Sequence, residues 1–189
     1  MKKNIIHASI EILANEGIEA ISAKKIADIL NTSKSNVFHH FKSVESILDE
    51  VFDTILNYMI DPIIGHNFET VKELMMFIGQ GIYNLSSEER TVYIVTFQLY
   101  SISLYNNKYQ NNLLKQKQAI MQVITNELLK LTSADEETCK TVSEMMLMTL
   151  DGYGLSSLLD NKHLHYKKLW EININYWCEL LTEKGENND

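Results

Sequence analysis

The segment between residues 22 and 48 limits the possible folds of the chain more than any other part of the sequence. It predicts two short helices that are separated by a polar turn and followed by a longer helix. Ser22 is a natural N-cap of the first helix, since its hydroxyl can accept a hydrogen bond from a backbone N–H at the helix start. Asn31, Thr32 and Ser33 interrupt the helical pattern, because such side chains bond to nearby backbone in turns and caps. This is the layout of a helix-turn-helix unit, whose second helix enters the major groove of DNA.

The second helix of this unit is predicted from Lys34 to His40, with Ser33 as its N-cap. Val37 and Phe41 are separated by about one helical turn, so both are expected to point inward. The opposite surface then presents basic, amide, hydroxyl and aromatic groups to a DNA groove. These groups belong to Lys34, Ser35, Asn36, Phe38 and His39.

Helices are also predicted on both sides of this unit. Residues 4–16 form an amphipathic pattern, and Gly17 fits the C′ position that ends such a helix. Ser43 can cap a long amphipathic helix, which is predicted over residues 44–60. The result is a three-helix unit followed by a connecting helix.

Four short motifs follow one another through this part of the chain: Ala14-Asn15-Glu16-Gly17, then Ser22 with Ile26-Ala27, then Ser33-Lys34-Ser35-Asn36-Val37-Phe38-His39-His40-Phe41, then Ile47-Leu48. Their order resembles the N-terminal DNA-binding domain of the TetR family of bacterial transcriptional regulators. The resemblance covers about residues 3–52, and the rest of the chain agrees with the family in length and helical character. It implies an all-α protein of about nine helices, with a helix-turn-helix domain and a larger helical domain for ligand binding and dimerisation.

Two positions depart from the family pattern. The family usually has Tyr where this chain has Phe38 and commonly has Lys where this chain has Val44, and both family residues contact phosphate. The one arginine, Arg90, lies outside this domain, so bidentate contacts from arginine to guanine are excluded. Asn36 is expected to favour A·T-rich sites, unless it is only solvated. The predicted DNA-contacting residues are Ser22, Lys24, Lys25, Ser33, Lys34, Ser35, Asn36, Phe38, His39 and Lys42.

The distribution of charge reconciles DNA binding with an acidic chain. The net charge is −8, which by itself argues against a nucleic-acid partner. Residues 1–44 carry six lysines against four acidic residues, whereas the remainder carries 11 basic against 21 acidic residues. Because an acidic body repels DNA, the basic tip is the productive contact, and binding is expected to depend steeply on salt.

The domains are predicted to span residues 1–44 and 45–189. Asp61-Pro62 and Gly65-His66-Asn67 are predicted to break the connecting helix, because proline cannot continue it. Ser86 and Glu89 form a capping box at a helix start, and Ser133 and Glu136 are predicted to form another. Helices are expected at about residues 68–85, 86–105, 108–131, 133–159 and 164–182.

The last two predicted helices are apolar on more than one side, which a helix packed only within its own domain does not need. One stripe consists of Met145, Met148, Leu155 and Leu159 with Leu169, Ile172, Tyr176 and Leu180. The other stripe is assigned to a symmetric four-helix dimer interface, as the resemblance also implies. Its residues are Leu147, Leu150, Gly154, Leu158, Tyr166, Trp170, Trp177 and Leu181. The alternative is that this stripe seals the core of the monomer.

The resemblance implies a ligand pocket in the middle of the second domain. Methionine adapts its shape, aromatic rings stack and tyrosine hydroxyls orient polar groups, so a small, largely apolar ligand is expected. Candidate lining residues are Met76, Tyr83, Tyr93, Phe97, Tyr100, Met121 and Met145. The alternative for each of them is ordinary core packing.

Enzymatic function is the main rival class. The sequence has no Gly-rich phosphate loop, no Gly-x-Ser-x-Gly elbow and no His-Glu-x-x-His helix. His163 and His165 have only Asp160 as a nearby carboxylate, so no metal site and no cofactor are predicted. Cys139 and Cys178 are far apart and are expected to be reduced thiols. No secretory signal and no apolar stretch of about 18 residues is recognised, which predicts a cytoplasmic protein without a membrane span.

The sequence therefore predicts a homodimeric repressor that binds a palindromic double-stranded DNA operator and is released by a small-molecule effector. Two tips of one dimer would enter successive major grooves about 34 Å apart. The effector would move the connecting helix and change that separation. The alternative is a partner-binding regulatory protein that keeps the helix-turn-helix scaffold without reading DNA, because Phe38 and Val44 replace phosphate-contacting residues.

Overall fold

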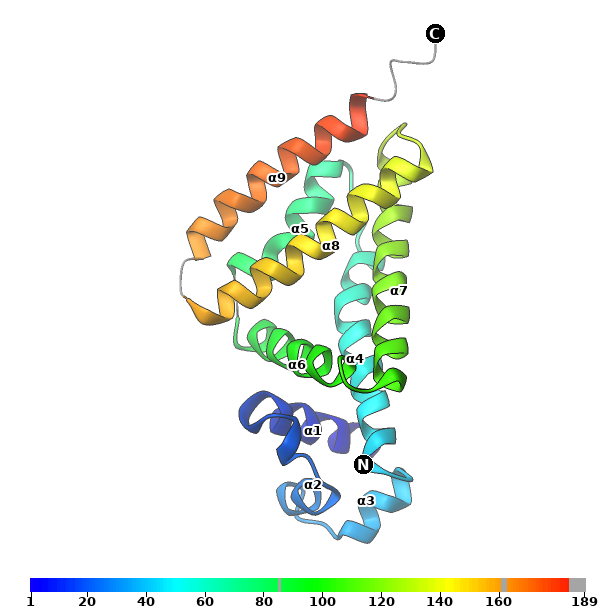
Figure 1. Ribbon diagram of the computed structural model, residues 1–189, viewed down its shortest axis with the longest axis vertical. Coiled ribbons are helices and arrows are strands. Elements are labelled where there is room, and N and C mark those ends of the chain that lie inside the picture. The colour runs from blue at the N-terminus through cyan, green and yellow to red at the C-terminus, as the bar shows by residue number, and fades with distance from the viewer. Residues whose placement is uncertain (85, 161–162, 184–189) are drawn as a thin grey trace. The chain divides into compact units, whose positions relative to one another are not determined.

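The computed structural model describes residues 1–84, 86–160 and 163–183. All regular secondary structure within these residues is helical (Figure 1). The all-α prediction is confirmed. The elements are α1 (Lys2–Glu16), η1 (Ile18–Ala20), α2 (Ala23–Ile29), α3 (Lys34–His40), α4 (Val44–Ile64), α5 (Val71–Tyr83), α6 (Ser87–Ser103), α7 (Asn107–Leu131), α8 (Glu136–Leu159) and α9 (His163–Glu183).

The chain divides into two compact units. Unit 1 contains residues 1–58 and 90–113, and unit 2 contains residues 59–89 and 114–189. Helix α4 therefore contributes to both units, and so does α7. The predicted domain boundary after residue 44 is a different division and stays a prediction.

Unit 1 is built around the three N-terminal helices, which lie together at the blue end of the chain in Figure 1. Helix α1 packs on α2, and α2 packs on α3. Apolar residues of these helices and of the first turns of α4 are buried. The residues of this core with at most 4% of their surface exposed are Ile5, Ala8, Ile12, Leu13, Ala23, Ile26, Ala27, Val37, Phe41, Ile47, Val51 and Phe52.

The predicted N-caps of α2 and α3 are confirmed, and α1 ends directly before Gly17 as predicted. The hydroxyl of Ser22 accepts from the N–H of Lys25 at 3.2 Å, and that of Ser33 accepts from the N–H of Asn36 at 3.1 Å. Gly17 ends α1 with φ of 84°, a region that favours glycine because other residues have a Cβ. Such local bonds fix the angles at which the short helices follow one another.

Two predicted helix signals, at Pro62 and at residues 133–136, were wrong, and α5 begins at Val71 rather than near residue 68. Helix α4 runs through Pro62 to Ile64. A proline removes only one N–H donor, and the next turn still closes through the bond from Gly65 N–H to the Asp61 carbonyl at 2.9 Å. Helix α8 begins at Glu136 with Asp135 as its N-cap, whose carboxylate accepts from Thr138 N–H at 2.7 Å. A capping box at residues 133 and 136 is therefore excluded, whereas the box of Ser86 and Glu89 is confirmed at 2.7 and 3.2 Å.

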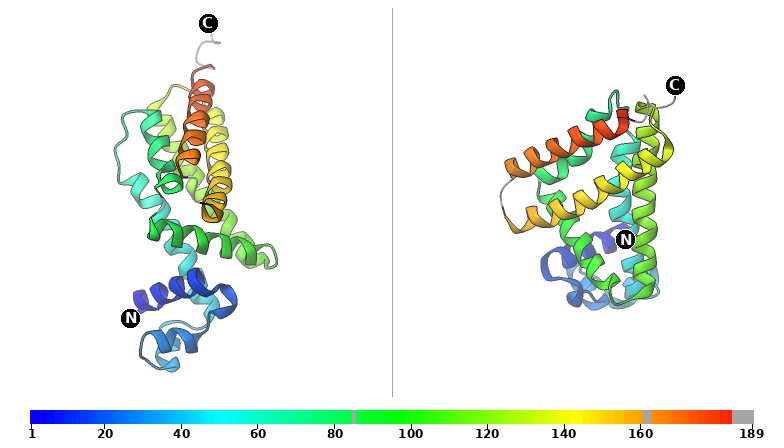
Figure 2. Two further views of the ribbon diagram at one scale, coloured as in Figure 1. Left: turned by 90° about the vertical axis from the view of Figure 1, so that its left-hand side faces the viewer. Right: turned by 45° about the horizontal axis from the view of Figure 1, so that its top comes forward.

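Unit 2 is organised by α5, α8 and α9, each of which packs against the other two. Helices α8 and α9 lie side by side in both views of Figure 2. Trp170 of α9 is fully buried, and its indole N–H donates to the Met75 carbonyl of α5 at 2.9 Å. A Cβ atom on Gly79 would lie 2.2 Å from the indole nitrogen of Trp170, so only glycine allows this close approach. In the described part of the chain no helix has the length and apolarity needed to cross a bilayer.

Candidate nucleic-acid interface

The candidate interface is the outer surface of α3 with the residues around it. A short turn joins α2 to α3, and Asn31 takes φ of 49° there, which asparagine tolerates better than most residues. Val37 is fully buried and Phe41 is 4% exposed, as predicted. The helix is thereby fixed with its opposite face toward solvent.

The exposed face of α3 carries the groups that the sequence predicted for it. Lys34, Ser35, Phe38 and His39 are exposed. The ammonium group of Lys34 lies 5.6 Å from the centre of the Phe38 ring, within the range of a cation–π contact. The charge of Lys34 is therefore held over the aromatic surface in the middle of the helix. Phe38, which cannot bond to phosphate, still orients a group that can.

Asn36 is half-buried, less exposed than Lys34 and Ser35, and its amide donates to the Thr32 hydroxyl at 2.8 Å. This contact was not foreseen from the sequence, although the spacing of four residues across a turn is a recognisable signal. An asparagine that reads adenine uses one N–H and its oxygen, so the second N–H and the oxygen of Asn36 still suffice. The bond to Thr32 fixes the side chain before any DNA arrives.

The serines at the start of α3 form a small hydroxyl cluster. Ser33 and Ser35 hydroxyls lie 2.8 Å apart, while Ser33 also caps the helix. Backbone N–H groups at a helix start favour phosphate, and hydroxyl groups there can donate to it. Ser22 caps α2 in the same way.

The predicted lysines differ in their partners. Lys24 and Lys42 are exposed, whereas Lys25 is half-buried and forms an ion pair with Glu16 at the end of α1. At the other end of α3, the exposed rings of His39 and His40 meet edge to face, with centroids 5.2 Å apart. Lys24, Lys34 and Lys42 thus present the least neutralised positive charge around this surface.

The predicted ligand residues are all half-buried, which fits neither a closed core nor an open surface. Met76, Tyr83, Met121 and Met145 belong to unit 2, and Tyr93, Phe97 and Tyr100 belong to unit 1. The Tyr83 hydroxyl donates to the Met76 carbonyl at 2.8 Å. Burial raises the pKa of Tyr83, and the negative charge of Glu171 raises it further. None of the seven lines the groove of about 410 Å³ bordered by Ile64, Val123, Asn126, Glu127, Leu129 and Lys130.

Most of the predicted dimer residues are buried inside the single chain. Trp170, Trp177 and Leu181 are 0 to 3% exposed, and Leu147, Leu150 and Tyr166 are 4 to 7% exposed. Gly154 is also buried, and Leu158 is half-buried. A side chain without exposed surface cannot bury area against a second copy, so the seven buried residues are corrected to the core of unit 2. These seven residues fit the alternative interpretation, in which the stripe seals the core of the monomer.

The first apolar stripe faces outward instead. On α8, Met148, Leu155 and Leu159 are 62, 45 and 81% exposed, and on α9, Ile172 and Tyr176 are 55 and 52% exposed. We call these five residues the α8–α9 stripe. Gly152 lies on the same face of α8, and a Cβ atom placed there would meet nothing within 4 Å. The fold of the chain itself therefore does not require a glycine at this position.

The structure shows no cluster of three or more histidine, cysteine or carboxylate side chains placed to hold a metal ion in its described residues. His165 is exposed, and residues 161 and 162 of the loop before it lie outside the described part. Cys139 and Cys178 are thiols, and burial raises the pKa of each.

Residues 5–51 match the family described as bacterial regulatory proteins, tetR family. The chain is also 21% identical over 169 residues to IcaR of Staphylococcus aureus, the negative transcriptional regulator of the biofilm operon icaADBC. That alignment covers 86% of this chain and 87% of IcaR.

Solved structures share the fold at low sequence identity. A transcriptional regulator from Rhodococcus sp. Rha1 aligns with a TM-score of 0.81 at 14% identity, covering 94% of this chain and 96% of its own. A protein from Saccharomonospora viridis, named as a transcriptional regulator and solved in complex with choline, aligns with a TM-score of 0.74 at 18% identity. It covers 93% of this chain and 95% of its own.

Proposed function

Residues 5–51 match the TetR family of bacterial regulatory proteins, and from that premise we propose that the chain is a homodimeric repressor that leaves its operator when an effector binds. The observation that carries the proposal is the exposed face of α3. It combines Lys34, Asn36 and His39 on a helix whose buried side is fixed by Val37 and whose start is capped by Ser33. That is the arrangement a recognition helix needs to enter the major groove.

The direction of regulation is taken from the relative. IcaR is named as a negative regulator, and it aligns with most of this chain. A dimer that occupies a promoter blocks transcription without any further activity. Repression is therefore the simplest use of the proposed DNA interface.

The homodimer is proposed to form through the α8–α9 stripe. Five large apolar side chains, each 45% or more exposed, are costly to leave in water unless another surface covers them. Gly152 lacks a side chain in the middle of this stripe, where a second helix can approach closely. Since α8 and α9 are adjacent, two copies related by a two-fold axis would form a four-helix bundle.

The effector is proposed to be a small, largely apolar molecule. Within unit 2, the half-buried Met76, Tyr83, Met121 and Met145 would supply adaptable contacts and a stacking face. The regulator of Saccharomonospora viridis was solved with choline, a quaternary ammonium compound of the kind that aromatic rings recognise. Choline is accordingly the first compound to test.

Release is proposed as a shift between two separations of the DNA-binding tips. A dimer fits its operator when the two recognition helices are about 34 Å apart, the spacing of successive major grooves. To weaken operator binding 100-fold, the effector needs about 2.7 kcal/mol of preference for the other separation.

The test is selection of bound sequences from random duplex DNA with the purified protein, followed by titration of the recovered duplex. A palindrome with half-sites one helical turn apart is expected. If no sequence is enriched while the protein is folded and dimeric, the protein is better described as a partner-binding regulator that keeps the helix-turn-helix scaffold. Phe38 and Val44 would then be the first positions to restore, as Phe38→Tyr and Val44→Lys.

A further inference from the structure

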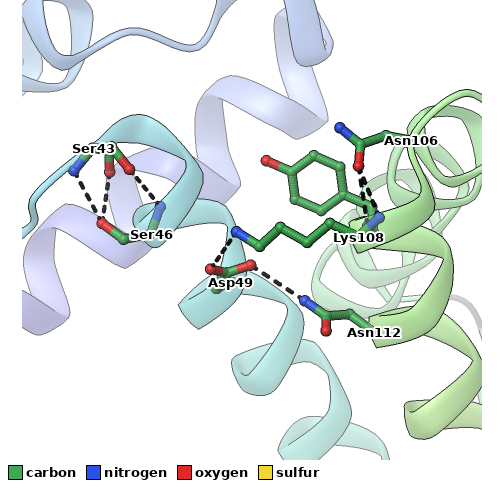
Figure 3. Close-up of polar contacts among 7 residues, drawn as sticks. Ser43, Ser46, Asp49, Asn106, Lys108 and Asn112 are labelled. Atoms are coloured by element: carbon green, nitrogen blue, oxygen red, sulfur yellow. Dashed lines mark hydrogen bonds and ion pairs between the residues drawn. The ribbon is translucent and has the colours of Figure 1, made fainter.

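The first turns of α7 contact the first turns of α4 through the carboxylate of Asp49. The ammonium group of Lys108 bonds to one oxygen of Asp49 at 3.0 Å, and the amide of Asn112 donates to the other at 3.3 Å (Figure 3). Both oxygens of Asp49 therefore have partners on the same neighbouring helix. All these residues belong to unit 1.

An aromatic contact lies beside this polar one. The rings of Phe52 and Tyr109 stack with centroids 5.8 Å apart and planes within 9° of parallel. Phe52 is one turn beyond Asp49 on α4, and Tyr109 follows Lys108 on α7, so both contacts join the same two helix faces. Phe52 and Tyr109 are 1% and 6% exposed. We call Asp49 and Phe52 with Lys108, Tyr109 and Asn112 the α4 anchor.

The α7 side of the α4 anchor is fixed by its own cap. The side-chain oxygen of Asn106 accepts from the N–H groups of Lys108 and Tyr109 at 3.0 and 3.4 Å. The side-chain oxygen of Asn106 thus orients the residues that reach α4 (Figure 3). The hydrogen bond to Asp49 also raises the pKa of the Lys108 amine.

The α4 side leads directly to the recognition helix. Ser43 and Ser46 bond reciprocally at 3.2 Å, backbone N–H to hydroxyl in both directions, which closes the start of α4. Only Phe41, Lys42 and Ser43 separate α3 from α4, and Phe41 is buried in the core that both helices share. With so short and fixed a link, the direction of α4 sets the direction of α3.

We propose that the α4 anchor positions the recognition helix for operator binding, with Asp49 as its central residue and Lys108 and Asn112 as its partners. This inference rests on the proposed function, because it assigns positioning residues to DNA binding. Helix α7 continues from the α4 anchor into unit 2 as one helix.

Asp49→Ala distinguishes a positioning role from a purely electrostatic one, because the two roles predict opposite changes in operator affinity. Removing an acidic charge near DNA strengthens binding if only charge matters. Loss of the α4 anchor instead weakens binding to the selected operator, by about 10-fold, while binding to random duplex is unchanged or slightly tighter. Asp53→Ala is the matched control, since Asp53 is an exposed acid one turn further along α4. It is expected to leave the ratio of operator to random binding unchanged.

Asn112→Leu removes one contact without changing charge. It is expected to lower the same ratio by about 3- to 10-fold, and Asn111→Leu, at the exposed neighbouring position, is its control. Thermal unfolding of each variant shows whether the fold survives. An Asp49→Ala protein that is folded and binds the operator as tightly as Asp53→Ala overturns the proposal.

A measurement without DNA keeps this result distinct from failure of the proposed function. Amide hydrogen exchange in residues 44–52 of the free protein is expected to rise in Asp49→Ala and Asn112→Leu, and to stay unchanged in the two controls. If the wild-type protein selects no duplex but exchange rises in this way, the DNA-binding function fails while the α4 anchor stands. Unchanged exchange in all four variants contradicts the α4 anchor whether or not DNA binds.

Discussion

The two units of this chain use charge and packing in opposite ways. Unit 1 carries eight basic and eight acidic residues, whereas unit 2 carries nine basic against 17 acidic residues. In unit 1, ion pairs of Lys2 with Glu50, Lys25 with Glu16 and Lys108 with Asp49 neutralise acids close to the helix-turn-helix. Residues 90–113 add two basic residues and no acidic one. A chain of net charge −8 thus keeps a neutral unit for DNA and confines its excess of acid to the other unit.

The units also differ in what determines their structure. The helix ends of unit 1 are closed by bonds between residues two to four positions apart, as at Ser22, Ser33 and Ser43. The core of unit 2 depends on partners far apart in sequence, such as Trp170 against Gly79. Local rules therefore specify the first unit, and the complementary shapes of distant side chains specify the second.

The largest effect is expected from breaking the packing of unit 2. Trp170→Ala removes a fully buried indole and its bond to the Met75 carbonyl, so the free energy of unfolding should fall by about 3–5 kcal/mol. Urea unfolding followed by circular dichroism measures this. Tyr105→Ala is the control, because Tyr105 is 88% exposed in unit 1, and it should change stability by less than about 0.5 kcal/mol. Similar losses in both variants would contradict the contrast between the units.

The next effect tests the outer surface of unit 2. Leu155→Glu places a charge in the α8–α9 stripe and should weaken dimerisation by about 2–4 kcal/mol, because a charge buried without a partner is unfavourable. Sedimentation equilibrium across a range of protein concentrations measures the change. Leu104→Glu, at a 76% exposed leucine of unit 1, should leave the dimer intact. A wild-type protein that is monomeric at micromolar concentration rules out the proposed interface.

The contrast explains which parts of the fold could be predicted. Caps and turns depend on neighbouring residues, so the helix-turn-helix was predicted nearly to the residue, including the inward positions of Val37 and Phe41. The prediction that Pro62 ends α4 was wrong. The effect of a proline on a helix depends on its position in the helix, and Pro62 lies in the last turn. At residues 133–136, Asp135 and Ser133 both qualify as caps, and the pattern alone does not choose between them.

The faces of α8 and α9 could not be chosen from the sequence for a different reason. Both helices have two apolar stripes, and the size of the tryptophans suggested that they would lie at an interface. The structure buries both tryptophans, Trp170 directly against a glycine of α5, and nothing near Trp170 in sequence reveals Gly79. Asp49, Lys108 and Asn112 were missed likewise, since a contact between α4 and α7 depends on tertiary structure.

A smaller effect concerns the neutral unit. Lys34→Ala and Lys42→Ala should each weaken binding to every duplex by about 10-fold and reduce the slope of log affinity against log salt by about one. Asn36→Ala should mainly relax the choice of base at one operator position. Titrations at several salt concentrations distinguish the two behaviours, with Lys115→Ala in unit 2 as the charge-matched control. If Lys115→Ala changes the slope as much as Lys34→Ala does, the charges act through the whole chain and not through the tip.

The smallest effect is expected at Glu73 of unit 2, whose carboxylate is stabilised by its surroundings. The Glu73 carboxylate accepts from Glu69 N–H at 2.8 Å and lies 3.3 Å from the His66 ring nitrogen, and these contacts, the backbone bond first, lower the pKa of Glu73. A lowered pKa in the folded state means that stability is present above the ordinary carboxyl pKa and is lost as pH falls through the lowered value. Glu73→Gln should therefore be less stable than wild type near neutral pH, with the difference shrinking in acid. Thermal unfolding across this pH range checks the prediction, with Glu88→Gln as an exposed control. A difference that grows in acid would mean that the ionised form of Glu73 destabilises unit 2, as its excess of negative charge alone would suggest.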